Sequence, residues 1–226
     1  CWLFFNFFNS PPRKWIRTIL NMCFNHSKTF IVVLIIVNID FFSTPFDIES
    51  VDYLQSIDCD LYKVASFDIV NKKLLEKVAT TKKPIIMSVG MSNIEEINSA
   101  YNILKAKGSN IAILHCISSY PTKEEDANLS VIFKLKELFD CVIGQSDHTN
   151  DIEVPLYAVS AGAQIIEKHY KIDEAMDCID SPVSITEEQM RKLVDQTRRI
   201  ESLFGEPVFK IRECEINAQI FRRKTS

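Results

Sequence analysis

The sequence predicts an α/β fold built on a parallel sheet, and three features of the chain support it. Six apolar runs recur along the chain, beginning near Ile39, Leu61, Pro84, Asn110, Cys141 and Ala163. Such continuous runs are typical of parallel strands that are buried on both faces, and their spacing of about 20 to 30 residues matches a βα unit. Amphipathic stretches lie between them, and no turn-rich linker interrupts the series. We therefore expect one domain of consecutive βα units with right-handed crossovers.

The stretches between the apolar runs carry helix start and stop signals. The segment from Asn93 to Lys107 follows Ser92, and Glu95 three residues later completes a capping box. Gly108 then ends the segment, as expected at the C-terminus of a helix. The other helices are expected at Ile48 to Ile57, Asn71 to Thr81, Asn128 to Phe139, Asp151 to Ala161 and Glu187 to Phe204.

Composition and charge narrow the class of protein. A formal net charge of −4 with mixed signs gives no polybasic surface, so nucleic acid is not an expected partner. The seven cysteines form no CxxC pair and no paired zinc-ligand spacing, and several fall in or beside predicted core elements, namely Cys59, Cys116 and Cys141. We expect free buried thiols in a reducing cytoplasm rather than a disulfide framework. These features are typical of a soluble, cytoplasmic enzyme of one domain.

Residues 1–38 differ in kind from the rest of the chain. The segment begins with Cys, contains no Asp or Glu, and includes a strongly apolar run from Phe30 to Val37. This run falls short of the roughly 18 to 20 residues that a membrane span needs, and no small-residue cleavage site of a signal peptide follows it. We interpret the segment as an incomplete or mistranslated start, with a membrane anchor as the alternative.

Polar side chains gather where the apolar runs end. The change is sharpest in FFSTPFD (Phe41 to Asp47), LYKVASFD (Leu61 to Asp68), IGQSDHT (Ile143 to Thr149) and IIEKHY (Ile165 to Tyr170). In a barrel of parallel strands the reacting groups sit at this end, so we expect an active-site rim. Hydroxyl groups at successive strand ends come from Ser43, Thr44, Ser66, Ser88, Ser118 and Ser146. Each hydroxyl alone could cap a loop, but together they suggest a cradle for a multiply charged anion.

Two histidines and one lysine stand at the same kind of position. His148 and His169 end consecutive strands. Neighbouring strands lie about 4.8 Å apart, so the two imidazoles can meet at one ion such as manganese, iron or zinc. The alternative for each histidine is a hydrogen bond to a loop backbone. Lys63 ends another strand, where it could hold a carboxylate or phosphate of a ligand or form an ion pair with a carboxylate such as Asp68.

Seven segments together resemble the sialic acid synthase family, the phosphoenolpyruvate-dependent nonulosonate synthases. They are, in the family's order and spacing, FFSTPFD, YKVASFD, IIMSVGMS, LHCISSYPT, GQSDHT, GAQIIEKHY and IDSPVSIT. The resemblance implies a (β/α)8 TIM barrel that uses a divalent metal, Mn2+ first, with Mg2+ and Co2+ as alternatives. It implies condensation of phosphoenolpyruvate with an N-acyl hexosamine, N-acetylmannosamine-like or a 2,4-diacetamido sugar, to a nonulosonic acid with release of phosphate. YKVASFD and IDSPVSIT are more similar to pseudaminate and legionaminate synthases than to N-acetylneuraminate synthases.

The resemblance also implies roles for individual residues. His148 and His169 match the family's metal-binding and catalytic histidines. Ser118 and Tyr120 match active-site residues, and Asp180 matches a contact to the acceptor sugar. Contacts to phosphoenolpyruvate are matched by Thr44, Lys63, Ser66, Ser88 and Ser146.

The chain also departs from the family pattern. The family's first two strands bring a catalytic glutamate and a phosphoenolpyruvate-binding lysine, and residues 1–38 resemble neither. We therefore expect residues 39–210 to form a partial barrel, equivalent to strands 3–8, with two unpaired edges and with helix or coil in place of the missing strands. Residues 211–226 resemble the linker to a small antifreeze-like domain that is absent here and on which the family's homodimer depends. We expect impaired activity, and the alternative to an enzyme is a non-catalytic remnant or a phosphate- and metal-binding subunit.

Overall fold

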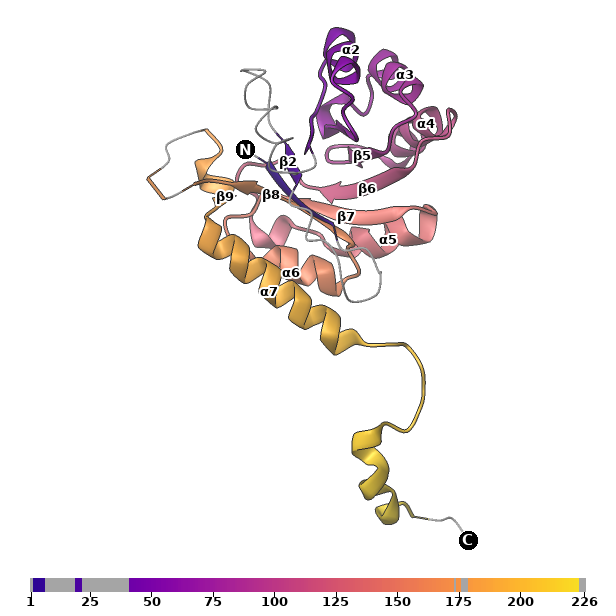
Figure 1. The fold of residues 1–226 in the computed structure, drawn as a ribbon, viewed down its shortest axis with the longest axis vertical. Helices are drawn as coiled ribbons and strands as arrows, with labels where there is room; N and C mark the ends of the chain where they lie inside the picture. Colours follow the sequence, from indigo (N-terminus) through magenta and orange to yellow (C-terminus); the bar gives the residue numbers. More distant parts are fainter. Residues whose placement is uncertain (1, 7–18, 22–40, 173, 176–178, 224–226) are drawn as a thin grey trace.

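Six parallel strands in sequence order form the main sheet (Figure 1). The computed structural model describes residues 2–6, 19–21, 41–172, 174–175 and 179–223. The six strands are β3 (Phe41–Phe42), β4 (Tyr62–Val64), β5 (Ile85–Ser88), β6 (Ile111–Cys116), β7 (Val142–Asp147) and β8 (Ile165–Tyr170). Neighbouring strands from β4 to β8 pair in parallel, and β3 meets β4 through a parallel bridge between Ser43 and Tyr62. The predicted strands and their order are confirmed.

Helices alternate with these strands and lie on the outside of the curled sheet (Figure 1). They are α2 (Ile48–Ser56), α3 (Lys72–Thr80), α4 (Ile94–Lys105), α5 (Ser130–Leu138), α6 (Glu153–Ser160) and α7 (Glu187–Phe204). Every helix falls within two residues of its predicted position. The α/β class and the incomplete barrel that the sequence predicts are thereby confirmed.

The start of α4 differs from the prediction by one residue. Asn93, rather than Ser92, is the N-cap: its side-chain oxygen accepts a hydrogen bond from the N–H of Glu96 at 2.9 Å. The Glu96 carboxylate in turn accepts from the N–H of Asn93, also at 2.9 Å. Ser92 donates instead to the carbonyl of Gly90 at 3.1 Å. Asn and Ser cap helices about equally well, so the sequence alone did not separate the two overlapping capping boxes.

Two further strands, β1 (Trp2–Asn6) and β2 (Ile19–Asn21), cover the edges of the main sheet. β1 pairs antiparallel with both β8 and β2, and β2 pairs in parallel with β3. An open edge leaves a row of N–H and C=O groups unpaired, and these two strands pair with them. The prediction of two unpaired edges, with helix or coil in place of strands, is therefore wrong for these residues. The apolar run Phe30–Val37 lies outside the described residues.

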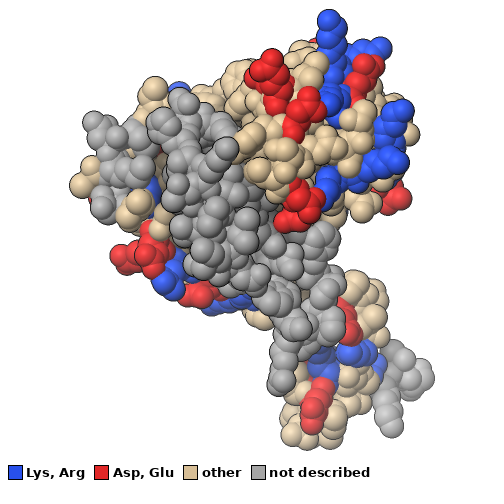
Figure 2. All heavy atoms as spheres, turned by 45° about the horizontal axis from the view of Figure 1, so that its top comes forward, with Lys and Arg blue, Asp and Glu red and all other residues tan. Residues whose placement is uncertain are grey.

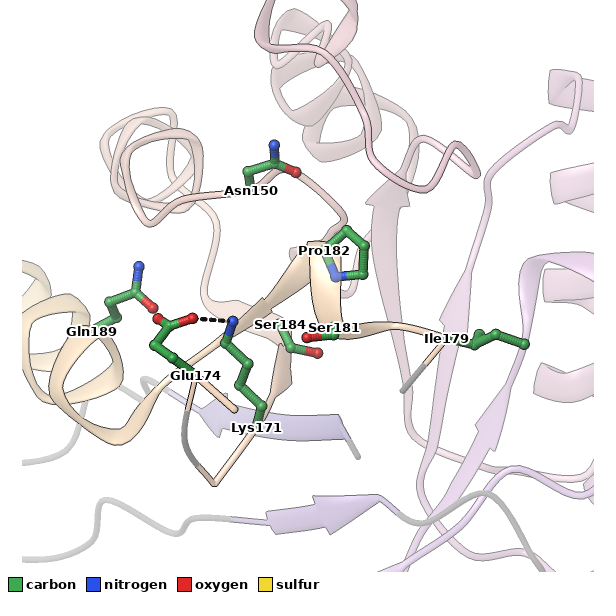
Figure 3. A pocket seen from close by; sticks show the side chains of 8 residues that line it. All are labelled: Asn150, Lys171, Glu174, Ile179, Ser181, Pro182, Ser184 and Gln189. Carbon is green, nitrogen blue, oxygen red and sulfur yellow. Dashed lines mark hydrogen bonds and ion pairs between the residues drawn. The ribbon is translucent and has the colours of Figure 1, made fainter. Parts of the chain in front are cut away.

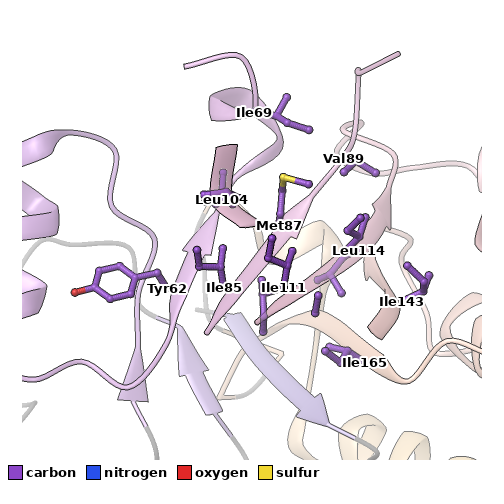
Figure 4. Packing of buried hydrophobic residues seen from close by; sticks show 14 of the residues in the cluster. Tyr62, Ile69, Ile85, Met87, Val89, Leu104, Ile111, Leu114, Ile143 and Ile165 are labelled. Atoms are coloured by element: carbon purple, nitrogen blue, oxygen red, sulfur yellow. The ribbon is translucent and has the colours of Figure 1, made fainter. Parts of the chain in front are cut away.

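The hydrophobic core is built from the apolar runs. Every residue of β5 and β6 is buried, as a strand covered on both faces requires. Figure 4 shows the packing of side chains from neighbouring strands, among them Tyr62, Ile85, Met87, Ile111, Leu114, Ile143 and Ile165. The predicted free thiols are confirmed for three cysteines that the structure describes: Cys59 and Cys116 are buried and Cys141 is half-buried.

The remaining elements are short. They are the 3-10 helices η1 (Ser66–Asp68), η2 (Glu124–Asp126), η3 (Ser181–Val183) and η4 (Glu213–Phe221), and the strand β9 (Ser184–Ile185), which pairs with β8. The helix η4 follows α7, and the others follow strands of the main sheet. On the face in Figure 2, Lys and Arg are interspersed with Asp and Glu rather than gathered in one basic patch. None of the helices that the structure describes combines the length and the apolar character that a membrane crossing requires.

Candidate active site at the carboxyl ends of the strands

A buried ion pair joins β4 and β8. The Lys63 Nζ lies 3.3 Å from the Glu167 Oε2, and only 5 % and 1 % of the two side chains are exposed. Lys63 also donates to the Ser88 Oγ at 2.6 Å, and the Ser88 hydroxyl donates to the Glu167 Oε2 at 3.5 Å. The sequence suggested Asp68 as the carboxylate of such a pair, and this partner is wrong. Asp68 instead accepts from the Asn71 side chain at 3.4 Å.

Glu167 was not singled out from the sequence, although it lies at the centre of this group. Burial raises the pKa of its carboxyl group, whereas the Lys63 charge and hydrogen bonds from Ser146 and Ser88 act in the opposite direction. A signal for Glu167 was present, because residues two apart on a strand point to the same face. Glu167 stands two residues before His169 and therefore faces the same interior.

The loops after β4, β5 and β6 come close together around Gly90. The Gly90 N–H donates to the Ser66 Oγ at 2.9 Å. A Cβ added at Gly90 would lie 2.4 Å from the Ser118 Oγ and 3.1 Å from the Ser66 Oγ. Glycine at this position therefore allows two of the predicted hydroxyls to approach the end of β5, where Ser88 binds Lys63.

The other predicted hydroxyls lie along the same edge. Ser43 and Thr44 follow β3 and are buried, and the Ser43 carbonyl accepts from the N–H of Lys63 at 3.1 Å. Ser146 lies in β7, is buried, and hydrogen-bonds to Glu167. Five successive strands, β3 to β7, thus each bring a hydroxyl to this edge, as the sequence predicted.

His148 and His169 meet at the ends of β7 and β8, as predicted. Their ring centroids are 5.3 Å apart, and 2 % and 0 % of the two residues are exposed. The His148 Nδ1 lies 2.8 Å from the carbonyl oxygen of Ile117. Because a carbonyl oxygen only accepts, the proton of the neutral ring is on Nδ1 and the lone pair is on Nε2. A backbone bond of this kind orients a histidine that offers its other nitrogen to a metal.

Burial keeps both imidazoles in the neutral form. It lowers the pKa of His148 to about 4. Burial and then the neighbouring His148 lower the pKa of His169 to about 2. The Asp180 Oδ2 lies 3.5 Å from the His169 Nδ1, so the predicted acceptor-sugar residue adjoins the histidine pair. Neutral imidazole is the form that ligates a metal.

Tyr120 covers the histidine pair on its solvent side. The Tyr120 ring centroid lies 4.1 Å from that of His148 and 5.7 Å from that of His169, and 44 % of Tyr120 is exposed. The structure therefore divides the predicted site into two neighbouring groups at one edge of the sheet. One is the lysine–hydroxyl group around Lys63, and the other contains the two histidines with Tyr120 and Asp180.

The histidine group offers a small donor set for a divalent ion. Among the residues that the structure describes, no group of three or more His, Cys, Asp and Glu side chains is arranged to hold a metal. Two neutral imidazoles, one with its lone pair fixed on Nε2, fit an ion that takes its other ligands from water and substrate oxygens. The residues present are thus compatible with an open metal site rather than a closed structural one.

A separate pocket of about 520 Å³ lies beside the segment that connects β8 to α7 (Figure 3). It is lined by Asn150, Lys171, Glu174, Ile179, Ser181, Pro182, Ser184 and Gln189. The Lys171 ammonium and the Glu174 carboxylate form an ion pair at 2.5 Å within it. None of the predicted site residues lines this pocket, so we do not assign the reaction to it.

Comparison with known proteins assigns the chain to a family. A model of the NeuB family matches residues 21–209, which include the strands β3 to β8 and both groups of the site. This chain belongs to the NeuB family. It is 40 % identical, over 79 % of its length and 54 % of the relative, to N,N'-diacetyllegionaminic acid synthase of Campylobacter jejuni. It is 36 % identical, over 80 % of its length and 53 % of the relative, to pseudaminic acid synthase of the same organism.

Comparison with solved structures agrees with this assignment. The chain superimposes on N-acetylneuraminic acid (sialic acid) synthetase of Leptospira borgpetersenii, in complex with citrate, with a TM-score of 0.82 and 40 % identity. The match covers 86 % of this chain and 70 % of that protein. The chain spans about half the length of the curated NeuB relatives that it matches. The family that the seven sequence segments predict is confirmed.

Proposed function

We propose that this NeuB chain is part of an enzyme that condenses phosphoenolpyruvate with an N-acyl hexosamine, forming a nonulosonic acid and releasing phosphate. The observation that carries the proposal is the proximity of two groups at one edge of the sheet. A buried lysine with hydroxyl neighbours suits an anion, and a pair of neutral histidines suits an ion that acts on a carbonyl oxygen. The names of the matched relatives support this choice of reaction.

The lysine–hydroxyl group is the proposed place of phosphoenolpyruvate. Its carboxylate and phosphate need several donors, and hydrogen bonds to ionised groups are stronger than those between neutral groups. Lys63 supplies a compact cation, already held at 2.6 Å from the Ser88 hydroxyl. Further donors at the same edge are the hydroxyls of Thr44, Ser66, Ser88 and Ser146.

The histidine group is the proposed place of a divalent metal, Mn2+ first, with Mg2+ and Co2+ as alternatives. His148 and His169 would hold it, and when bound it supplies Lewis-acid polarisation of the aldehyde oxygen of the acceptor. Tyr120 limits the access of water to this place. Asp180, beside His169, is the proposed contact to the acceptor sugar, either N-acetylmannosamine-like or a 2,4-diacetamido sugar.

The reaction can be written with all atoms accounted for. Carbon 3 of phosphoenolpyruvate attacks the aldehyde carbon of the open-chain sugar, and the aldehyde oxygen takes a proton. Positive charge develops at carbon 2 and is stabilised by its oxygen substituent. Water adds at carbon 2 and loses a proton, which balances the proton taken up by the aldehyde oxygen. The carbon–oxygen bond to phosphate then breaks, the carbon 2 ketone forms, and the second proton of the water leaves with the phosphate. In this scheme Lys63 and the hydroxyls keep the phosphate and carboxylate in place while charge moves at carbon 2.

Labelled water tests this reaction directly. The chain is incubated with phosphoenolpyruvate, Mn2+ and the acceptor sugar in water enriched in oxygen-18, and the phosphate is analysed by 31P NMR. Carbon–oxygen cleavage predicts unlabelled phosphate, and label in the phosphate contradicts the proposal. The second candidate is a phosphate- and metal-binding subunit with little turnover, favoured by the lack of any Asp or Glu in residues 1–38. This candidate predicts that phosphoenolpyruvate and Mn2+ bind to the chain but that no phosphate is released.

A further inference from the structure

A second buried ion pair lies on the opposite face of β7 and β8 from the histidines. Asp147 and Lys168 are register partners in the parallel pairing of the two strands. The Lys168 Nζ lies 2.7 Å from the Asp147 Oδ2, and 0 % and 1 % of the two side chains are exposed. Asp147 directly precedes His148, and Lys168 directly precedes His169.

The Asp147 carboxylate also holds the residue that follows His148. Its Oδ2 accepts from the N–H of Thr149 at 3.2 Å and from the Thr149 hydroxyl at 2.8 Å. Its Oδ1 accepts from the Gln145 side chain at 3.2 Å. Lys168 completes the group by donating to the Thr149 carbonyl oxygen. The backbone on both sides of His148 is therefore tied to β8, one residue before His169.

We propose that Asp147, Thr149 and Lys168 form a brace that positions His148 relative to His169 and so sets the affinity of this edge for a divalent ion. The proposal rests on the metal site proposed above. A buried ion pair contributes little net stability, because desolvation of the two charges offsets their attraction. The brace therefore acts through geometry: without it, the residue before and the residue after His148 lose their fixed places.

The size of the effect follows from groups that orient metal ligands in other proteins. Loss of such an orienting partner typically weakens metal binding about 10- to 100-fold. The brace residues touch no ligand themselves, so they are positioning residues. Their loss is expected to weaken Mn2+ binding without abolishing it, whereas loss of His148 itself abolishes it.

The test removes both charges together. In Asp147→Leu/Lys168→Met, two apolar side chains of similar volume replace the pair, which avoids a lone buried charge. Leu135→Ala, a buried core position in α5, is the matched control, because it destabilises the protein and removes none of the hydrogen bonds or charges of the brace. Mn2+ binding to the full chain is measured by calorimetry at a temperature at which circular dichroism shows every variant folded. We expect about 10- to 100-fold weaker binding in the double variant and parent-like binding in Leu135→Ala. Parent-like binding in the double variant overturns the proposal.

A second readout does not depend on a metal. NMR of the metal-free chain labelled with nitrogen-15 in histidine reports the tautomer and the order of each ring. In the parent and in Leu135→Ala, the His148 ring should show a single tautomer with its proton on Nδ1. In the double variant, the signals of the His148 ring should be averaged over several orientations and both tautomers. An unchanged His148 signal in the double variant overturns the brace. Failure of the parent to bind Mn2+ overturns the metal site instead, and the NMR comparison still decides on the brace.

Discussion

The Lys63 ammonium lies 3.3 Å from the Glu167 carboxylate in the interior of the protein, and the Ser88 hydroxyl hydrogen-bonds to both groups. The pair connects β4 with β8, the second and the sixth of the six parallel strands in the main sheet. It also means that the proposed anion site contains its own carboxylate. An incoming phosphate or carboxylate has to share the Lys63 charge with Glu167.

A first prediction concerns the contribution of this ion pair to the stability of the protein. Lys63→Met leaves Glu167 buried without its cation, which should lower the free energy of unfolding by about 3 to 5 kcal/mol. Lys63→Met/Glu167→Gln removes both charges and should recover most of that loss. Urea unfolding measures both variants. Lys77→Met, which breaks the partly exposed pair between Lys77 and Asp52, is the control and should cost less than about 1 kcal/mol. Equal losses in the single and the double variant would contradict the role of the pair.

A second prediction concerns Gly90. An added methyl group would lie 2.4 Å from the Ser118 Oγ, so Gly90→Ala should push apart the loops after β5 and β6. The expected cost is about 1 to 3 kcal/mol, as for other overpacked sites, and thermal unfolding measures it. Gly90→Ala/Ser118→Gly removes the closest atom and should recover part of the loss. No recovery of stability in the double variant would show that the contact with the Ser118 hydroxyl does not cause the loss.

A third prediction concerns pH and His115. His115 is buried, its Nε2 lies 2.7 Å from the Ala127 carbonyl oxygen, and burial lowers its pKa. The His115 imidazole is therefore protonated at a higher pH in the unfolded chain than in the folded chain. The contribution of neutral His115 to the free energy of unfolding is therefore fully present above the pKa of the histidine in the unfolded chain, about 6.5. It is lost as the pH falls through the lower pKa of His115 in the folded protein.

The matched variant is His115→Gln, which does not titrate and can still donate to Ala127. Urea unfolding between pH 7 and pH 5 should show a smaller loss of stability for this variant than for the parent. Identical pH profiles of parent and variant would exclude His115 as a source of the pH dependence.

A fourth prediction concerns the metal. His148→Ala and His169→Ala should each abolish Mn2+ binding in a calorimetric titration, because the described part of the chain offers only these two imidazoles at the site. His115→Gln should bind as the parent does, since His115 hydrogen-bonds elsewhere. Binding of Mn2+ by either alanine variant with parent affinity would remove the metal from this place.

Much of the fold could be predicted from the sequence because the physical signals are local. Strands covered on both faces must be apolar, so each strand and its polar end are visible in the chain. The carboxyl ends of parallel strands meet at one edge of the sheet, and for this reason the prediction that His148 and His169 lie together was correct. The capping box at Asn93 was misplaced only because Ser92 offers an overlapping one.

The missed features depend on contacts between distant segments. Glu167 meets Lys63 only because the sheet curls, and no local pattern near Lys63 points to a residue on β8. Lys168 follows an apolar run and is completely buried against Asp147, whereas a lysine is expected at the surface unless it is paired. The strands β1 and β2 were missed because no motif in residues 1–38 indicates that these segments pair with the edges of β8 and β3.

The central claim is that this edge of the sheet holds phosphoenolpyruvate through Lys63. Calorimetric titration of phosphoenolpyruvate into the chain, with Mn2+ present, tests it most directly. The variant is Lys63→Met/Glu167→Gln, which should remain folded, and the control is Lys171→Met, a lysine of the separate pocket. Loss of a charged hydrogen bond costs about 1.5 to 3 kcal/mol, so the double variant should bind roughly 10- to 100-fold more weakly, while Lys171→Met binds as the parent. Equal affinity of the parent and the double variant, or no binding by the parent, would contradict the account.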